Sequence, residues 1–359
     1  MDSVLWYYVH MLERFLEKFS NDIGIDLGTA NTLVYLRGRG IVINEPSVVA
    51  LNQKTNRVVA VGIEAKNMMG RTPGHIRIVR PLVDGVISDY EVTEEMLSYL
   101  INKANEIDKK LLRPRVVIGI PVGVTNVEMR AVYDAAKSAG ASKVYIVEEP
   151  TAAAIGVHMP IHEPVGNMIV DIGGGTTDIA VIALSGVVRS KSLKIAGDKI
   201  TTDIISYMRD EFKMLIGEKT GENIKMELCS ALPLLEREEM NIKGRDLVSG
   251  LPREVTITDG DIREATHASI MQLVEAIREV LETTPPEVLA DIMQKGITLA
   301  GGGALIKRLP EFLETQLKVP VTVADDPLTA VARGTGIILE DIDIYKDVLV
   351  ENTDDISFR

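Results

Sequence analysis

Two short segments of the chain follow the same plan, and this repetition limits the fold more than any other feature. Each contains an apolar run, an Asp, a glycine-containing turn, a Thr and further apolar residues: residues 25–32 (IDLGTANT) and residues 170–178 (VDIGGGTTD). Apolar and β-branched residues around glycines predict two strands joined by a tight turn, because glycine permits positive φ and close backbone approach. The repeat therefore predicts two similar halves, each with one such hairpin.

The two turns have the composition of a phosphate site. Consecutive backbone N–H groups without intervening side chains form an anion nest, and Thr hydroxyls add donors for phosphate oxygens. The carboxylates of Asp26 and Asp171 would repel phosphate unless a cation lay between them, so we expect Mg²⁺, whose shell is completed by carboxylates, phosphates and water. One hairpin alone is equally compatible with an ordinary glycine turn, whereas the pair favours a nucleotide held from two sides.

The composition is that of a globular protein with at least two domains. The chain has 359 residues, of which 46% are hydrophobic and 25% charged, enough for a large core. A formal net charge of −13 argues against a nucleic-acid-binding protein, which needs a basic face. The five His residues show no metal-ligand spacing, and we interpret the single Cys229 as a buried bystander.

No apolar run approaches the roughly 18 to 20 residues that cross a bilayer, and a signal peptide is not evident, so we expect an intracellular protein. Residues 4–19 nevertheless have the pattern of a strongly amphipathic helix. This helix could lie in a membrane interface. Its polar face carries balanced charge, however, so packing on the body or on a second subunit stays open, as does an extension read from an upstream start codon.

Strands and helices alternate along the rest of the chain, which predicts a mixed or parallel sheet covered by helices. The glycine-rich turns lie at strand ends, where ligands bind in such sheets. The expected elements include strands at 115–120, 144–147 and 297–300, a helix after the capping box at 125–128, and helices at about 92–107, 202–216 and 262–281.

Five segments, in order, resemble the actin-like ATPases, and within them the MreB family of bacterial actin homologues, which are rod-shape-determining proteins. The resemblance extends from Asn21 to about Ile344. The intervening sequence is also MreB-like, which separates the chain from chaperones and sugar kinases with the same core fold. The segments are IDLGTANTLVYL (25–36), EEPTAAAIG (148–156), VDIGGGTTDIAVI (170–182), LAGGGALIKRLP (299–310) and DPLTAVARGTG (326–336).

The resemblance implies the α/β actin-like (ribonuclease H-like) fold, with two similar large domains around a nucleotide cleft and a smaller outer subdomain on each. After an amphipathic extension over 1–20, the implied parts are subdomain IA (21–50, 84–163 and 333–359), IB (51–83), IIA (164–199 and 264–332) and IIB (200–263).

The resemblance also assigns residues to a site for ATP and Mg²⁺. The phosphates would contact Gly28, Thr29, Ala30 and Asn31 on one side, and Gly173, Gly174, Gly175 and Thr176 on the other. Asp26 and Asp171 would hold the ion, mostly through water. The adenosine would lie beside Gly301, Gly302 and Gly303, with adenine and ribose contacts from Glu222 and Lys225.

One part of this assignment depends on the family match, and one feature of the first hairpin differs from conventional actin. Without it, Glu222 and Lys225, spaced i,i+3 on a helix, would be interpreted as a surface ion pair of little energetic value. The first hairpin lacks the Lys that conventional actin offers to the phosphates. Charge neutralisation would then depend on Mg²⁺, backbone N–H groups and helix dipoles.

Hydrolysis of ATP needs an in-line water and stabilised charge more than covalent chemistry. Glu149, at a strand end and before Pro150, is our candidate for orienting that water, with Thr176 assisting. Glu148 is the neighbouring alternative, and the family match favours Glu149. The resemblance implies a slow ATPase whose nucleotide state controls polymerisation.

The resemblance further implies a cytoplasmic protein that forms homopolymers, with paired protofilaments, on the inner face of the cell membrane. Its partners would be membrane proteins of the wall-elongation machinery. Leu111 and Leu112 lie in a loop flanked by cations, so the tip could insert into anionic lipid, although a Leu pair packed in the core is equally compatible with the sequence. A non-polymerising ATP-binding scaffold is the alternative in another functional class.

Overall fold

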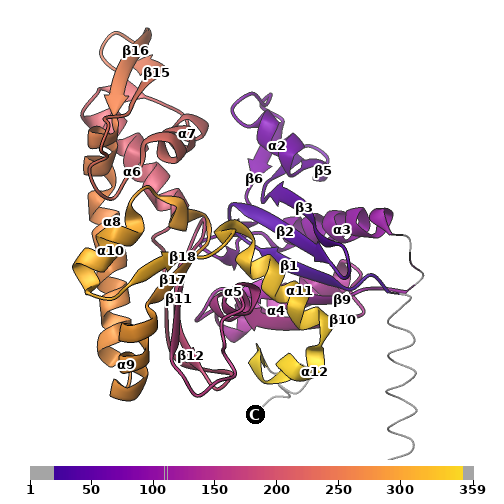
Figure 1. Ribbon diagram of the computed structural model, residues 1–359. Helices are drawn as coiled ribbons and strands as arrows, with labels where there is room; N and C mark the ends of the chain where they lie inside the picture. The colour runs from indigo at the N-terminus through magenta and orange to yellow at the C-terminus, as the bar shows by residue number, and fades with distance from the viewer. Residues whose placement is uncertain (1–19, 109, 111, 351–359) are drawn as a thin grey trace, which may run out of the picture. The chain divides into compact units, whose positions relative to one another are not determined.

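The computed structural model describes residues 20–108, 110 and 112–350, so the amphipathic segment 4–19 and Leu111 lie outside the described residues. The chain forms two compact units (Figure 1). Unit 1 extends to Met159 and resumes at Thr329, whereas unit 2 is the continuous stretch Pro160–Leu328. Within the described part of the chain, no helix has both the length and the apolar character needed to cross a membrane.

Unit 1 is built on a six-stranded mixed sheet in the order β19-β10-β9-β1-β2-β3. Strands β1 to β3 form an antiparallel meander, and β9 and β10 continue the sheet parallel to β1. The first two strands are the predicted hairpin. The strands are β1 (Ile23–Leu27), β2 (Asn31–Leu36), β3 (Gly40–Pro46), β9 (Arg115–Ile120), β10 (Lys143–Glu148) and β19 (Leu349–Val350).

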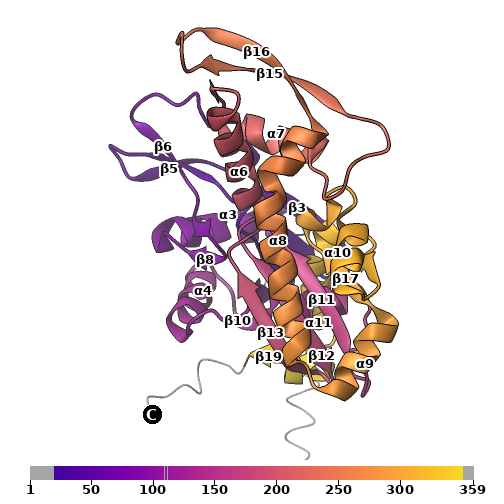
Figure 2. The same cartoon turned by 90° about the vertical axis from the view of Figure 1, so that its left-hand side faces the viewer.

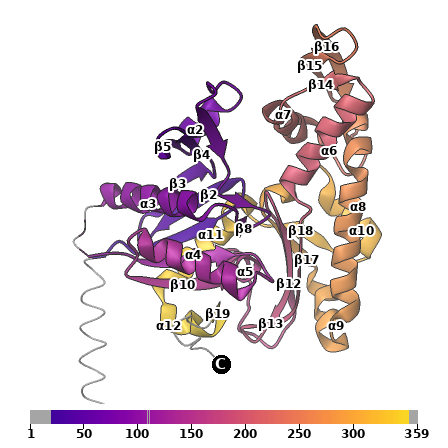
Figure 3. The ribbon, with the colours of Figure 1, turned by 180° about the vertical axis from the view of Figure 1, so that it is seen from behind.

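Helices cover both faces of this sheet (Figure 3). On one face, Ile23 and Ile25 of β1 belong to a core that also contains residues of α3 (Tyr90–Ile107) and α4 (Asn126–Ser138). Side chains alternate along a strand, so Gly24 and Asp26 face the other side. There lie α5 (Glu149–Gly156) and α11 (Ala330–Glu340). A Cβ atom at Gly24 would lie 2.4 Å from Thr335 Oγ1 of α11.

Helices α5 and α11 cross at backbone contact. A Cβ atom at Gly156 would lie 1.9 Å from the carbonyl oxygen of Ala330, and one at Gly334 would lie 1.8 Å from that of Ala152. Real Cβ atoms do not approach an oxygen so closely. The glycines in the segments EEPTAAAIG and DPLTAVARGTG therefore serve a packing role, because they allow the two helices to meet on the sheet.

We predict that Gly156→Ala destabilises the protein, because the added methyl group has to separate α5 from α11. The expected loss is about 2–3 kcal/mol in the free energy of unfolding, measured by urea denaturation. The control is Gly74→Ala, since a Cβ atom there would have no neighbour within 4 Å. The control should change stability by no more than about 0.5 kcal/mol. Equal stability of both variants would contradict the packing role.

Unit 1 also carries a small sheet in the order β5-β4-β6 with a core of its own around Ala50 and Ala65. Its elements are β4 (Val49–Asn52), β5 (Arg57–Val61), β6 (Ile76–Val79) and α2 (Ile63–Met68). Among the described residues, unit 1 also contains the β7 (Leu82–Val83) and β8 (Val86–Ile87) pair, α12 (Ile342–Tyr345) and the 3-10 helix η4 (Lys346–Val348).

Unit 2 repeats the sheet topology of unit 1. Its five strands lie in the order β13-β12-β11-β17-β18, with an antiparallel meander followed by two parallel strands. Asp26 and Asp171 occupy the same register position, because the residue after each pairs with a Thr of the next strand. The predicted duplication is confirmed. The strands are β11 (Asn167–Ile172), β12 (Thr177–Ala183), β13 (Gly186–Leu193), β17 (Ile297–Ala300) and β18 (Val321–Val323).

The helices of unit 2 include the long α8 (Asp259–Thr283), which runs along this sheet (Figure 2). Its apolar side chains pack with the sheet and with α9 (Pro286–Lys295) and α10 (Leu309–Leu317). A second core joins helices α6 and α7 to a small sheet. The elements of that core are α6 (Gly197–Asp210), α7 (Glu218–Leu228), β14 (Met214–Leu215), β15 (Glu239–Asp246) and β16 (Pro252–Thr258).

The helix expected at 202–216 is wrong at both ends. Helix α6 begins at Gly197 and ends at Asp210, and residues 214–215 form strand β14. Its N-cap residue, Ala196, has no side-chain cap. The first N–H groups of α6 instead donate to carbonyl groups of the turn after β11, which is distant in sequence.

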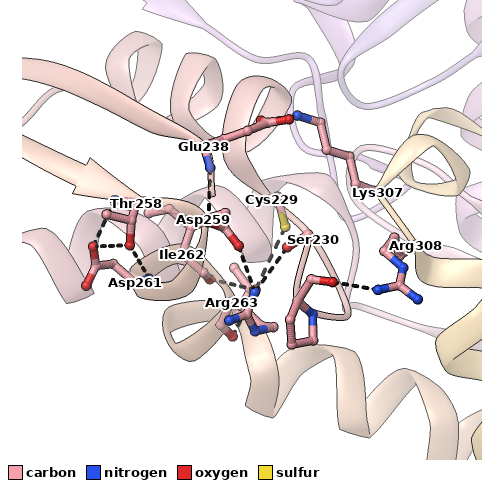
Figure 4. A network of polar contacts seen from close by, with 12 residues as sticks. Cys229, Ser230, Glu238, Thr258, Asp259, Asp261, Ile262, Arg263, Lys307 and Arg308 are labelled. Atoms are coloured by element: carbon pink, nitrogen blue, oxygen red, sulfur yellow. Dashed lines mark hydrogen bonds and ion pairs between the residues drawn. The ribbon is translucent and has the colours of Figure 1, made fainter. Parts of the chain in front are cut away.

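A polar network fastens the segment 229–238 to the start of α8 (Figure 4). Asp259 pairs with Arg263 at 3.0 Å and accepts a hydrogen bond from the backbone N–H of Glu238 at 3.3 Å. Thr258 and Asp261 form the capping box of α8. Cys229 is buried in the same region, and burial raises the pKa of its thiol, which disfavours the reactive thiolate.

Candidate functional site

The first glycine turn, residues 28–30, is fastened to unit 1 through its carbonyl groups. Ser47 Oγ donates to the carbonyl of Gly28 at 2.5 Å, and Ser47 N–H donates to that of Ala30 at 3.0 Å. Thr29 Oγ1 accepts from the N–H of Gly85 at 3.0 Å. Within the described part of the chain, the N–H groups of residues 28–30 donate to no protein acceptor. The turn thus presents donors on one side, as an anion nest requires. Asn31 begins strand β2 and is half-buried.

Asp26 and Glu149 lie at the same edge of the unit 1 sheet. Asp26 pairs with Gly119 of β9, Gly119 pairs with Val147 of β10, and Glu149 begins α5 directly after β10. A Cβ atom at Gly119 would lie 3.4 Å from Cγ of Glu149, so the Glu149 side chain lies over this glycine. Glu149 is buried, whereas Glu148, the N-cap residue of α5, is half-buried.

Burial raises the pKa of Asp26 to about 7. Removal from water disfavours the charged carboxylate and so raises its pKa. A nearby cation would favour the charged form again and lower the pKa. In the described residues no group of three or more His, Cys, Asp or Glu side chains could hold a metal. Mg²⁺ does not require such a group, because it is usually bound through one or two carboxylates with phosphates and water. The residues present therefore fit a nucleotide-associated Mg²⁺.

The second glycine turn, residues 173–176, is fastened by helix α6. Gly197 N–H donates to the carbonyl of Gly173 at 3.1 Å, and Asp198 N–H donates to that of Gly174 at 2.8 Å. Gly173 N–H closes the turn by donating to the carbonyl of Thr176 at 2.9 Å. The N–H groups of Gly174, Gly175 and Thr176 donate to no acceptor among the residues that the structure describes. This turn also presents its donors on one side.

The third glycine segment, Gly301 to Gly303, packs against the end of β11. Gly301 has φ +75°, and a Cβ atom there would lie 2.4 Å from Oδ1 of Asp171. A Cβ atom at Gly303 would lie 2.1 Å from Cγ2 of Ile172. Gly302 is the exposed member of the three. The sequence places these glycines far from Asp171, and the parallel pairing of β11 with β17 brings them beside it.

Glu222 and Lys225 of α7 form the i,i+3 ion pair that the spacing predicts, with Lys225 Nζ 2.7 Å from Glu222 Oε2. The pair is more than a surface contact, because Lys225 Nζ also donates to the carbonyl of Gly197 at 3.0 Å. Gly197 in turn contacts the second glycine turn. Unit 2 therefore groups Asp171, both of its glycine segments, Glu222 and Lys225, and unit 1 groups Asp26, its glycine turn and Glu149.

Ser47, Gly85 and Gly197 hold the two turns, and none of them was predicted from the sequence. Ser47 lies in the segment EPSVVAL, where nothing local indicates a hydrogen bond to a turn that is distant along the chain. The contacts form only when β3 pairs with β2 and when the start of α6 meets the turn between β11 and β12.

The loop that carries Leu112 lies at the start of β1. Leu112 is 38% exposed and forms a parallel bridge with Ser20, so it is not part of the core. Lys110 Nζ donates to the carbonyl of Ser20 at 3.1 Å. Arg115, one of the cations that follow Leu112, does not face solvent with the loop, because its guanidinium turns inward to the fully buried Asp22, with Nη2 2.5 Å from Oδ2.

Asp22 is the anchor of this loop. Burial by itself would raise the pKa of Asp22, but hydrogen bonds and charge from Arg115, with a hydrogen bond from Ser20, hold it below its usual range. A lowered pKa means that the folded protein favours the carboxylate. This stabilisation is complete above the unfolded-state pKa of about 3.9 and is lost as the pH falls through the folded-state pKa.

We predict that Arg115→Met reduces the free energy of unfolding by about 3 kcal/mol at pH 7, because it leaves a buried carboxylate short of its main partner. The difference from the parent protein should narrow as the pH falls and be smallest below the lowered folded-state pKa of Asp22 in the parent, where this carboxyl is protonated in both proteins. Urea denaturation at a series of pH values measures both effects. Arg113→Met, at an exposed position of the same loop, is the control. A difference that persists unchanged at low pH would contradict the role of Asp22.

Comparison with known proteins gives consistent results over nearly the whole chain. The family model described as MreB/Mbl protein matches residues 20–347. The cell shape-determining protein Mbl of Bacillus subtilis is 51% identical over 325 residues, which cover 90% of this chain and 97% of Mbl.

Solved structures show the same similarity. MreB5 of Spiroplasma citri bound to ADP has a TM-score of 0.86 and 41% identity, and the match covers 92% of this chain and 98% of MreB5. The MamK double helical filament has a TM-score of 0.77 and 25% identity, with 90% and 99% of the two chains covered. These neighbours have the actin-like fold.

Proposed function

Because this chain belongs to the MreB/Mbl family of actin-like proteins, we propose that it is a slow ATPase that polymerises on the inner face of the cell membrane. In this proposal its filaments, built from paired protofilaments, organise cell-wall synthesis with membrane proteins of the elongation machinery and so maintain rod shape. The observation that carries the proposal is the repeated turn. In each unit a glycine turn follows an Asp at a strand end, has its carbonyl groups bonded to the protein and presents N–H groups for phosphate.

We propose that both turns bind the phosphates of one ATP. The structure of MreB5 bound to ADP supports nucleotide binding in this family. Gly301 to Gly303 would contact the adenosine, with Glu222 and Lys225 on its other side. Mg²⁺ would be held by Asp26 and Asp171, mostly through water, and would supply positive charge to the phosphates.

We propose that Glu149 orients the attacking water. Its carboxylate would accept a hydrogen bond from a water molecule placed in line with the γ-phosphorus. The water oxygen would form the new P–O bond while the bond to the β,γ-bridging oxygen breaks, which releases ADP and phosphate. Thr176, whose hydroxyl is at the end of the second turn, would assist in holding the water. The burial of Glu149 beside Gly119, one strand from Asp26, supports this role over that of the neighbouring Glu148.

We predict that Glu149→Ala lowers the kcat of ATP hydrolysis about 100-fold and leaves the Kd for ATP nearly unchanged, because the side chain orients water and does not hold nucleotide. Phosphate release and calorimetric titration measure the two quantities. Glu148→Ala is the matched control and should retain most of the activity. Unchanged hydrolysis in Glu149→Ala would refute the assignment.

The subdomain boundaries are also a proposal. The sheet β5-β4-β6 lies mainly within residues 51–83, and the sheet β14-β15-β16 lies within residues 200–263. Each has a small core of its own, which supports its assignment as the outer subdomain of its unit.

Membrane attachment through Leu111 and Leu112 is supported by two observations. Leu112 is exposed, and its bridge with Ser20 means that the chain enters the described part of the fold beside this loop. Ser20, the first described residue, therefore lies next to the proposed lipid-binding tip. Repetition along a filament would multiply the weak attachment of a single subunit.

We predict that the protein forms filaments on anionic lipid monolayers in the presence of ATP, seen by negative-stain electron microscopy. Leu111→Ser combined with Leu112→Ser should reduce pelleting with anionic liposomes several-fold, because apolar area is lost from the tip. Filaments of this variant should still form in solution.

The outcomes separate the two parts of the proposal. Absence of filaments with ATP, in solution and on lipid, would favour the non-polymerising scaffold. Unchanged liposome pelleting, when residues 1–19 are also deleted, would remove the membrane assignment and leave polymerisation intact.

A further inference from the structure

The ammonium group of Lys225 lies close to the second glycine turn, with only the backbone of Gly197 between them. A Cβ atom built on Gly197 would lie 3.0 Å from Lys225 Nζ, 3.4 Å from the carbonyl oxygen of Gly173 and 3.6 Å from Cα of Gly174. The space between the ammonium and the turn is therefore no larger than a methyl group. A methyl group at residue 197 would require the Lys225 ammonium or the turn to shift by a few tenths of an ångström.

A continuous series of hydrogen bonds connects α7 to the turn. Lys225 Nζ donates to the carbonyl of Gly197 at 3.0 Å. Gly197 N–H donates to the carbonyl of Gly173 at 3.1 Å, and the next N–H, of Asp198, donates to that of Gly174 at 2.8 Å. The start of α6 thus holds two turn carbonyls, and Lys225 holds the start of α6.

The turn carbonyls of Gly173 and Gly174 accept the first N–H groups of α6 in place of an ordinary helix cap, and Lys225 donates to the Gly197 carbonyl beside them. Ala196, the N-cap residue of α6, provides no side-chain cap. Thr201 Oγ1 lies 3.0 Å from the Gly197 carbonyl and 2.7 Å from Glu222 Oε2, so it also connects α6 to the Glu222–Lys225 pair. Lys225 is only 15% exposed, which is low for a lysine side chain and consistent with a fixed position.

From this geometry we infer that Lys225 is a positioning residue for the phosphate-binding turn. By holding the Gly197 carbonyl, it fixes the start of α6, which keeps the carbonyls of Gly173 and Gly174 turned away from the N–H donors of the nest. The inference rests on the proposed function. It differs from the adenine and ribose contact implied by the family resemblance, because Lys225 would raise the affinity of the turn for phosphate whatever base the ligand carries.

The ammonium does not act as a free counter-charge for phosphate. Its charge is already balanced by Glu222 at 2.7 Å. A hydrogen bond from a charged donor contributes about 1.5–3 kcal/mol. If removal of this hydrogen bond destabilises the binding conformation of the turn by that amount, the affinity for phosphate falls about 10- to 100-fold.

The test compares Lys225→Met with the parent protein for three ligands in the presence of Mg²⁺: ATP, GTP and inorganic tripolyphosphate. Methionine retains the apolar stem, which could still pack on a nucleoside, and removes the donor. The inference predicts that all three ligands are weakened by the same factor, about 10-fold or more, and that Lys225→Arg restores most of the affinity by donating to Gly197. Lys219→Met, at an exposed position of the same helix, should change nothing.

A second variant covers the case in which Lys225→Met perturbs folding. Gly197→Ala inserts the methyl group between ammonium and turn, so it should weaken the same three ligands together. The inference is overturned if Lys225→Met and the parent protein have equal affinity for tripolyphosphate, which includes the case in which neither binds it. It is also overturned if the loss of affinity is confined to ATP. Failure of the parent protein to bind ATP by calorimetry would instead refute the proposed function.

Discussion

The structure depends on how two glycine turns are held by their carbonyl oxygens. A peptide group whose carbonyl is bonded to the protein directs its N–H the opposite way, so fixing the carbonyls creates a row of donors. In unit 1 both carbonyls are held by Ser47, through its hydroxyl and its backbone N–H, and Gly85 adds a hydrogen bond to the Thr29 hydroxyl. In unit 2 the carbonyls are held by the backbone of α6. Two different solutions therefore produce the same local chemistry on two copies of one sheet.

Local signals in the sequence were sufficient to predict the elements whose stabilising contacts lie within a few residues of one another. The two hairpins, the strand at 297–300 and the capping box of α4 were predicted because apolar alternation, glycine and a Thr–Glu pair act within a few residues. Helix α6 was misplaced because the acceptors for its first N–H groups are Gly173 and Gly174, which no local pattern connects to it.

The residues of the proposed site could be named from the sequence and remain a prediction, whereas the groups that hold them were not predicted. Glycine segments and the Asp before each turn have a recognisable composition, and Glu149 was proposed from its place at a strand end, with the family resemblance favouring it over Glu148. The resemblance supplied Glu222 and Lys225. The inward turn of Arg115 toward Asp22 was not predictable, since a run of cations in a loop is compatible with both surface and interior positions. Its orientation depends on a carboxylate at the start of β1, a strand that is distant in sequence.

The path of the chain has a consequence for biosynthesis. Unit 2 is continuous, whereas unit 1 is interrupted by it and is completed by α11 and β19 after Thr329. Until α11 emerges from the ribosome, Gly24, Gly156 and the face of β1 that carries Asp26 lack the helix that covers them. The first unit to be translated is thus the last to be finished, and a nascent chain carries a sheet face that lacks one of its two helices for the whole time that unit 2 is being made.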